Sequence, residues 1–124
     1  MKLIKKRWLK DFDLYKEVLN MVYFITDSNH IKIGYTKNDV RKRLKQLQTS
    51  NPNKLFLLGY IDGDKEIEKK LHKKFYASII RQNGEWFSPT QDLLDYINDN
   101  NLNENIFVDI IDNQVVGLFR LKGV

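Results

Sequence analysis

Two runs of β-forming residues, separated by a short polar turn, limit most strongly what this chain can fold into. Val22 to Ile25 reads VYFI and Ile31 to Gly34 reads IKIG, and β-branched and aromatic residues of this kind favour extended strands. Between the two runs, the short polar side chains of Asp27-Ser28-Asn29-His30 favour a turn. The pattern predicts a β-hairpin with Tyr23 on its first strand and Lys32 on its second. Whether these two side chains share a face depends on the register, which the sequence leaves open.

Two helices are predicted after the hairpin, because apolar residues recur there at helical spacing. The first runs from Asn38 to Gln48, and Thr36 with Asp39 has the spacing of a capping box, although Asp replaces the usual Glu or Gln. The second follows Asp62-Gly63-Asp64. The apolar residues that define the helices are Val40, Leu44 and Leu47 in the first, and Ile67, Leu71 and Phe75 in the second.

The remaining segments predict one more strand, one more helix and a second hairpin. The nearly continuous apolar run from Leu55 to Ile61 is typical of a buried central strand. Ser88-Pro89-Thr90-Gln91 is typical of a helix start, with Ser as N-cap, Pro at N1 and Gln at N3. The second hairpin comprises strands at 106–111 and 115–121 and a turn at 112–114. The order ββαβαα followed by ββ predicts an α+β domain with an antiparallel sheet.

A chain of 124 residues is expected to form one compact domain. Within it we expect a basic N-terminal helix or arm at 1–19, a central unit at 20–99 and a C-terminal hairpin extension at 100–124. The absence of cysteine excludes disulfides and thiolate metal sites, and no apolar run approaches the roughly 18 residues needed to cross a bilayer. No apolar stretch follows the basic N-terminus to make a signal peptide. We therefore expect a cytoplasmic protein without membrane contact, located in the host cytoplasm if its source is viral.

Positive charge is concentrated in the first two thirds of the chain. Residues 1–81 hold 19 Lys and Arg against 9 Asp and Glu, whereas residues 82–119 hold seven acidic residues and no Lys or Arg. A basic surface attracts polyanions, so nucleic acid is the favoured partner. The alternative is that the charges form ordinary solvated helix faces in a chain rich in Lys and Asn.

The first predicted helix separates its basic residues by direction, at 100° per residue. Arg43 lies about 60° from Val40, at the border of the apolar stripe, and could point into a cleft. Arg41, Lys42 and Lys45 point away from the stripe, where they could contact phosphates. A border arginine is otherwise a surface residue whose aliphatic part covers the core.

The second predicted helix carries a carboxylate and an imidazole beside its apolar stripe. Glu68 lies about 100° from Ile67, and His72 follows one turn later on the same side. Two such groups are too few for a structural zinc site, but they would suit Mg²⁺ that is also held by phosphate and water. The alternative is an exposed Glu among lysines and a surface His.

A polar loop with the sequence NGEWF follows the second helix. We expect Trp86 and Phe87 to anchor this loop on the core. Glu85 could be a structural hydrogen-bond acceptor and Asn83 could face a ligand, and the sequence leaves both roles open.

Together these pieces resemble the GIY-YIG nuclease superfamily, and most closely its short viral and bacterial branch. The resemblance rests on VYF, KIGYT, RLKQLQTSNP, EKKLHKKF and GEWF, and it covers roughly residues 21–97. It implies a metal-dependent endonuclease with a small three-stranded antiparallel sheet flanked by helices, so that residues 20–99 form a GIY-YIG nuclease-like domain. It also implies Mg²⁺ or Mn²⁺ as cofactor, nucleic acid, with DNA favoured, as substrate, and a phage or bacterial source.

The resemblance also assigns roles to individual residues. Tyr23 takes the place of the general base or its relay, Arg43 that of the phosphate-binding arginine, and Glu68 that of the metal ligand. Asn83 matches an asparagine that some members carry after the metal helix. Lys32 stands where the superfamily name has its second tyrosine; lysine is usual in this branch, and it argues against a mechanism that needs two phenols.

A tyrosine needs help to act as a base, because its unperturbed pKa is about 10. We expect the ammonium group of Lys32 to stabilise the phenolate of Tyr23 and lower its pKa, so that the two residues together activate water. Arg43 would stabilise the developing charge and Glu68 would hold the metal. His72 would assist proton transfer or orient Tyr23.

Two other functions fit the same residues. The first is a nucleic-acid-binding module that has the fold but lacks catalysis. The second is a protein-interaction or regulatory domain that uses the acidic third of the chain and the C-terminal hairpin. An exposed hairpin edge could pair with a second copy, so we expect either a monomer or a homodimer.

Overall fold

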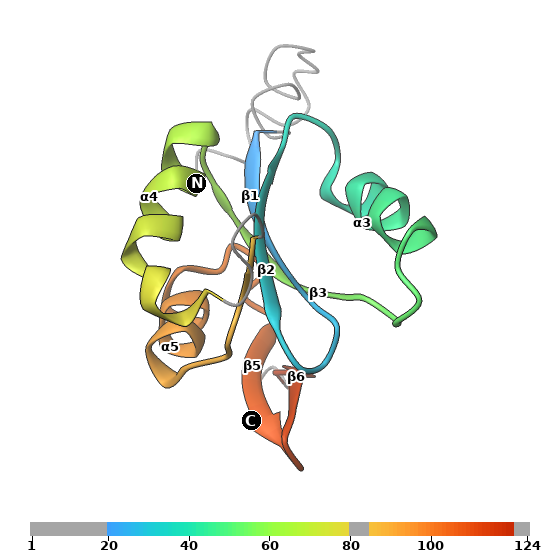
Figure 1. Cartoon of the computed structure of the whole chain (residues 1–124), viewed down its shortest axis with the longest axis vertical. Helices are drawn as coiled ribbons and strands as arrows, with labels where there is room; N and C mark the ends of the chain where they lie inside the picture. Colours follow the sequence, from blue (N-terminus) through green and yellow to red (C-terminus); the bar gives the residue numbers. More distant parts are fainter. Residues whose placement is uncertain (1–19, 80–84, 121–124) are drawn as a thin grey trace.

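A computed structural model describes residues 20–79 and 85–120 of the chain (Figure 1). The predicted N-terminal helix or arm at 1–19 and Asn83 lie outside these residues. The described part has an antiparallel sheet with helices on both faces and a separate hairpin at its C-terminal end. The predicted α+β class is therefore confirmed.

The main sheet has four strands rather than the expected three. Its order is β3-β1-β2-β4, and all neighbours are antiparallel. The additional strand is the two-residue β4, in which Trp86 and Phe87 pair with Lys32 and Ile31. The four strands are β1 (Met21–Thr26), β2 (Ile31–Thr36), β3 (Phe56–Asp62) and β4 (Trp86–Phe87).

Strand β1, and not the apolar run at 55–61, is the buried centre of the sheet. All six β1 residues are buried, because β1 has a strand on each side and helices on both faces. Strand β3 lies at an edge, so the prediction of a central strand there was wrong, and Phe56 at its start is exposed. Its apolar character has another cause: Leu58 and Ile61 pack in the main core, beside residues of the C-terminal hairpin.

The register of the first hairpin answers the question that the sequence left open. Tyr23 lies opposite Gly34, and Ile25 lies opposite Lys32. Since directly opposite residues share a face and faces alternate along a strand, Tyr23 and Lys32 lie on the same face of the sheet. The turn is closed by the side chain of Asp27, which accepts hydrogen bonds from the backbone N–H groups of two following residues.

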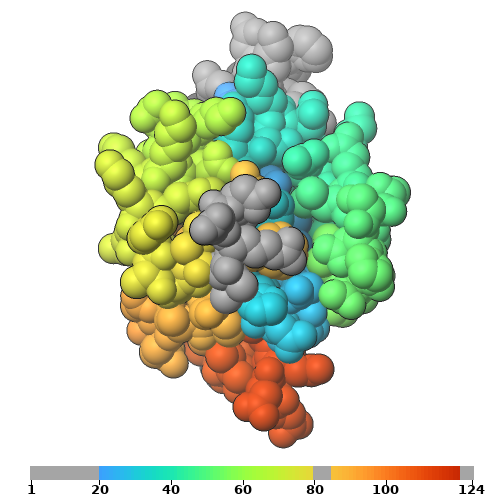
Figure 2. Space-filling view, in the orientation of Figure 1, coloured from blue at the N-terminus to red at the C-terminus, as the bar shows by residue number. Residues whose placement is uncertain are grey.

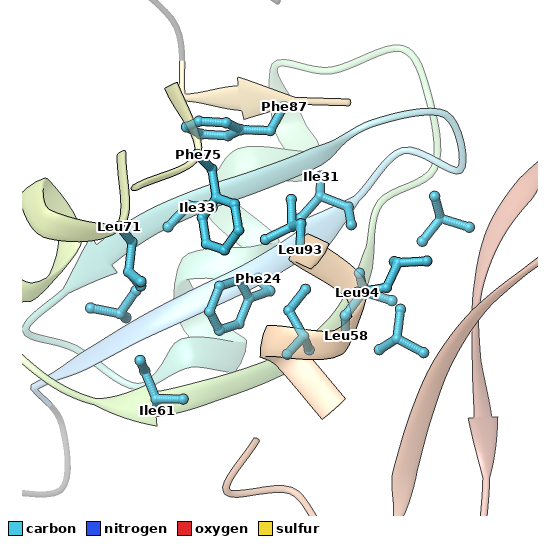
Figure 3. Packing of buried hydrophobic residues seen from close by; sticks show 14 residues of the cluster. Phe24, Ile31, Ile33, Leu58, Ile61, Leu71, Phe75, Phe87, Leu93 and Leu94 are labelled. Carbon is cyan, nitrogen blue, oxygen red and sulfur yellow. The ribbon is translucent and has the colours of Figure 1, made fainter. Parts of the chain in front are cut away.

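The two faces of the sheet are covered by different helices. Helix α3 (Val40–Thr49) covers the face that carries Tyr23, where the buried residues include Ile25 and Val40. Helices α4 (Lys65–Lys74) and α5 (Gln91–Asn100) cover the opposite face. Figure 3 shows the core on that side. The residues labelled in it are Phe24, Ile31, Ile33, Leu58, Ile61, Leu71, Phe75, Phe87, Leu93 and Leu94.

Two helices begin later than predicted. Asp39, and not Thr36, is the N-cap of α3, because its side chain accepts a hydrogen bond from the N–H of Arg41. Helix α5 begins after Thr90 rather than after Ser88. Ser88 still belongs to the extended segment that follows β4, since its N–H donates to the carbonyl of Ser78. None of the helices within residues 20–79 and 85–120 is long and apolar enough to cross a membrane.

The predicted second hairpin is confirmed as β5 (Ile106–Ile111) and β6 (Gln114–Phe119). Its two turn residues have positive φ, 53° for Asp112 and 65° for Asn113, as a tight two-residue hairpin turn requires. The inner side of the hairpin packs on the rest of the protein, because Val108 and Val115 belong to the main core. In addition, the amide of Asn98 on α5 bonds to both the N–H and the carbonyl of Val108.

Candidate active site

Tyr23 crosses from the central strand over its neighbour β2. Its side chain is 1% exposed, and a Cβ added to the opposite residue, Gly34, would overlap the Cζ and Oη atoms of the phenol. The ring therefore lies directly on the backbone of Gly34, with its hydroxyl end over that residue. Glycine inside a strand is unfavourable unless another group approaches the backbone closely, which is the case here.

Arg43 approaches the phenol from α3. It is half-buried, whereas Arg41, Lys42 and Lys45 on the same helix are exposed, as the helical spacing predicts. The guanidinium group favours the phenolate of Tyr23 through a polar contact and through its charge. One of its nitrogens also donates to Oε1 of Gln46 at 3.3 Å. Arg43 is thus held beside Tyr23, and the other three basic residues remain available to solvent.

The outer edge of β2 changes partner at Ile33. Strand β4 pairs only with Ile31 and Lys32, and the N–H of Ile33 then donates to the carbonyl of Glu85 at 2.9 Å. The carbonyl of Ile33 lies 2.9 Å from Nε2 of His72 on α4. Since a carbonyl only accepts, this nitrogen carries the hydrogen. His72 therefore replaces a strand partner and fixes α4 against the sheet edge.

Glu68 lies one helical turn before His72 and is buried, with 7% of its surface exposed. Its Oε2 lies 3.8 Å from Nε2 of His72. Burial and the negative charge of Glu85 raise the pKa of Glu68 above its ordinary value, while His72, Lys65 and Lys32 lower it. The alternative interpretation of Glu68 as an exposed carboxylate among lysines is wrong, because α4 presents it to the edge of the sheet.

Lys32 forms an ion pair that the sequence analysis did not predict. Its Nζ lies 2.6 Å from Oε1 of Glu85 and 5.7 Å from the centre of the Trp86 ring. Glu85 is thus a hydrogen-bond acceptor, a role that the sequence left open. Trp86 and Phe87 anchor the segment as predicted: Trp86 packs on the α3 face and Phe87 is fully buried on the other.

The pKa of Tyr23 moves in the direction opposite to the prediction. Burial raises it above 10.0, and the carboxylates of Glu85 and Glu68 raise it further. The positive group that lowers it is Arg43, not Lys32. The expectation that Lys32 activates the phenol is therefore wrong for the free protein: Arg43 is the cation that acts on Tyr23, and Lys32 pairs with Glu85.

The structure brings together five of the residues selected from the sequence: Tyr23, Lys32, Arg43, Glu68 and His72. Helix α3 supplies Arg43 from one face, and α4 supplies Glu68 and His72 around the edge of β2. Figure 2 shows α3 and α4 on either side of the surface formed by β2 and the loop after it. No group of three or more His, Asp or Glu side chains suited to a metal occurs within the part of the chain that the structure describes.

Gly34 and Glu85 are the two members of the site that the sequence analysis did not select. Gly34 could have been found, since a glycine within a predicted strand indicates close approach of another group. Glu85 gives no such signal: it lies 53 positions from Lys32 in the sequence, and only the pairing of β4 with β2 brings the two together.

Comparison with known proteins gives one match. The family model described as the T5orf172 domain matches residues 20–101, from the start of β1 to the end of α5. No curated protein and no solved structure matches the chain.

Proposed function

The chain belongs to the T5orf172 domain family, and we propose that it is a metal-dependent endonuclease of the GIY-YIG type that hydrolyses phosphodiester bonds, with DNA as the favoured substrate. One observation supports this most: a phenol, a guanidinium and a buried carboxylate from three separate elements meet at one edge of the sheet. Tyr23, Arg43 and Glu68 stand there in the chain order that the superfamily resemblance implies.

In the proposed hydrolysis of a phosphodiester bond, Arg43, Tyr23 and His72 have different roles. Arg43 binds a phosphate oxygen and stabilises the charge that develops on it. Tyr23 binds and orients the attacking water with its hydroxyl. It can accept a proton only as the phenolate, so its own proton must first be lost to solvent, and further positive charge near the ring is needed for that because burial favours the neutral phenol. His72 holds α4, and hence Glu68, in place through the carbonyl of Ile33.

The donor set at the site fits Mg²⁺ or Mn²⁺. Glu68 offers carboxylate oxygens, which these ions prefer, and such ions are commonly held by one or two carboxylates together with substrate phosphate and water. The raised pKa of Glu68 reflects a buried negative charge for which a cation would compensate. When bound, the ion would supply charge neutralisation at the phosphate.

Arg41, Lys42 and Lys45 provide a surface for the nucleic acid next to the site. They are exposed on α3, so each can reach a backbone phosphate without disturbing the core. Contacts of this kind depend on salt and carry no sequence information. Binding is therefore expected to weaken steeply as the salt concentration rises.

A module that binds nucleic acid without cleaving it is the second candidate. The raised pKa of Tyr23 favours it, since a neutral phenol is a poor base. Salt-dependent binding with no cleavage under any divalent ion, at neutral or alkaline pH, would support this function instead.

Cleavage of supercoiled plasmid and of single-stranded DNA and RNA with Mg²⁺ or Mn²⁺ tests the proposal. We expect wild type to nick or cut at least one substrate, and Tyr23→Phe, Arg43→Gln and Glu68→Gln each to lose about 100-fold or more in rate. Glu66→Gln, which removes an exposed carboxylate from the same helix, is the matched control and should keep the wild-type rate. Wild-type rates in the Tyr23 and Glu68 variants would refute the proposed site.

A further inference from the structure

Lys32 and Glu85 form the shortest ion pair of the described residues, and it lies inside the proposed active site. Nζ of Lys32 and Oε1 of Glu85 are 2.6 Å apart. The Lys32 side chain is 13% exposed and the Glu85 side chain 40%. The pair links the second residue of β2 to the residue before β4. The lysine is therefore largely enclosed, while the carboxylate is reached by solvent.

The ammonium of Lys32 is directed to the side of the sheet where a substrate phosphate would bind. Lys32 lies on the same face of the sheet as Tyr23. It is two residues before Gly34 on β2, and the phenol of Tyr23 rests on Gly34. The Trp86 ring beside Nζ restricts where the ammonium can move. A lysine binds carboxylate and phosphate oxygens in the same way, as a point charge with three donors. Glu85 therefore occupies the position that a phosphate oxygen would take.

The negative charge of Glu85 also acts on the rest of the site. It raises the pKa of Glu68 and that of Tyr23, so the Glu85 carboxylate lies near enough for its charge to act on both groups. A phosphate brought near these groups would meet two carboxylates, and like charges at short range oppose binding. Release of Glu85 from Lys32 would reduce this repulsion and leave the ammonium for the phosphate.

We propose that Glu85 is an intramolecular competitor of nucleic acid: it occupies Lys32 in the free protein, and a backbone phosphate displaces it on binding. Lys32 is accordingly a phosphate-binding residue, and Glu85 sets how readily the site accepts a nucleic-acid strand. The inference rests on the proposed function, because it requires nucleic acid to enter this site.

A double-mutant cycle on binding tests the competition without any cleavage. The affinity of a fluorescently labelled DNA for wild type, Glu85→Gln, Lys32→Gln and the double variant is measured by anisotropy with EDTA present. Glu85→Gln should tighten binding about fivefold, a value scaled to a partly exposed ion pair, and Lys32→Gln should weaken it. In the Lys32→Gln background, Glu85→Gln should change the affinity by less than about twofold.

Glu66→Gln is the control for net charge, because it removes one exposed carboxylate that faces no lysine of the site. It should give the same small change in affinity with Lys32 present or replaced. If Glu85→Gln raises the affinity for DNA equally with Lys32 present or replaced, Glu85 does not compete for Lys32. If Glu85→Gln alone lowers the affinity, the competition is also refuted, and Glu85 is then a positioning residue for Lys32. A wild type that cleaves but shows no coupling refutes only this inference, whereas a wild type that neither binds nor cleaves refutes the proposed function as well.

Discussion

Replacing Gly34 with alanine tests directly how Tyr23 is held in the site. The new Cβ would overlap the phenol at Cζ and Oη and would lie 2.7 Å from Cε1, whereas carbon atoms in favourable contact are about 3.5–4.0 Å apart. Tyr23 is 1% exposed, so its ring has no free space to move into. Overpacking of a well-packed core costs about 1–3 kcal/mol. We expect a loss near the upper end of that range, and displacement of the hydroxyl from Arg43.

Urea unfolding followed by tryptophan fluorescence measures this loss. A decrease of about 3 kcal/mol in the free energy of unfolding corresponds to a decrease of about 1 M or more in the midpoint. Gly117→Ala is the matched control, since its Cβ would lie 3.2 Å from Cγ2 of Ile106 and 3.7 Å from Cδ2 of Leu58. It should stay within about 1 kcal/mol of wild type, because alanine also lowers the entropy of the unfolded chain.

The cost of Gly34→Ala should depend on the side chain at position 23. In a Tyr23→Leu background the distal ring atoms are absent, and the same substitution at Gly34 should cost less than about 1 kcal/mol. An unchanged midpoint for Gly34→Ala, or an equal cost in both backgrounds, would refute the argument that the phenol rests on the backbone of Gly34.

Three further predictions concern the helix cap and the two buried acidic groups. Asp39→Ala should lower the free energy of unfolding by about 1 kcal/mol, because the N–H of Arg41 loses its partner; thermal or urea unfolding against Asp39→Asn checks this. Glu68 has a raised pKa, so its contribution to stability is present below about pH 4.5 and is lost as the pH rises through its folded-state pKa. The Glu68→Gln variant should therefore be more stable than wild type at neutral pH and equally stable in acid. Thermal unfolding at both pH values measures this difference. Burial also raises the pKa of Tyr23, so the contribution of the phenol to stability is lost only at alkaline pH, as the pH rises through that pKa. The Tyr23→Phe variant should therefore lose less stability than wild type between about pH 9 and about pH 11. An equal loss in both proteins would contradict the burial of the phenol.

Much of the fold follows from local patterns in the sequence. The strand at 21–26, the helix with Val40 on its buried side and the final hairpin depend on periodicity and turn residues, which short segments already contain. The directions of Arg43 and Glu68 on their helices follow from 100° per residue in the same way. What these patterns could not give is the partner of each strand. An apolar run such as Leu55 to Ile61 is compatible with a central strand and equally with an edge strand that a hairpin covers.

The helix starts show a second limit. Ser88-Pro89-Thr90-Gln91 has the residue types of a helix start, yet the N–H of Ser88 is engaged by the carbonyl of Ser78, from the segment after α4. The helix starts at Gln91, with Thr90 as its N-cap. Where several neighbouring residues can cap a helix, the sequence gives its start only to within about two residues.

Lys32 shows that the sequence predicts which residues lie near one another more readily than it predicts their electrostatic effects on one another. The hairpin register places Lys32 and Tyr23 on one face of the sheet, whereas their action in a common site stays a prediction. The prediction that Lys32 lowers the pKa of Tyr23 was wrong. Lys32 pairs with Glu85, which the pairing of β4 with β2 brings next to it. The cation that lowers the pKa of Tyr23 is Arg43. In the free protein, Lys32 is therefore engaged by Glu85 and not by the phenol of Tyr23. If the proposed function holds, a substrate phosphate is the group that would displace Glu85 and take up the positive charge of Lys32.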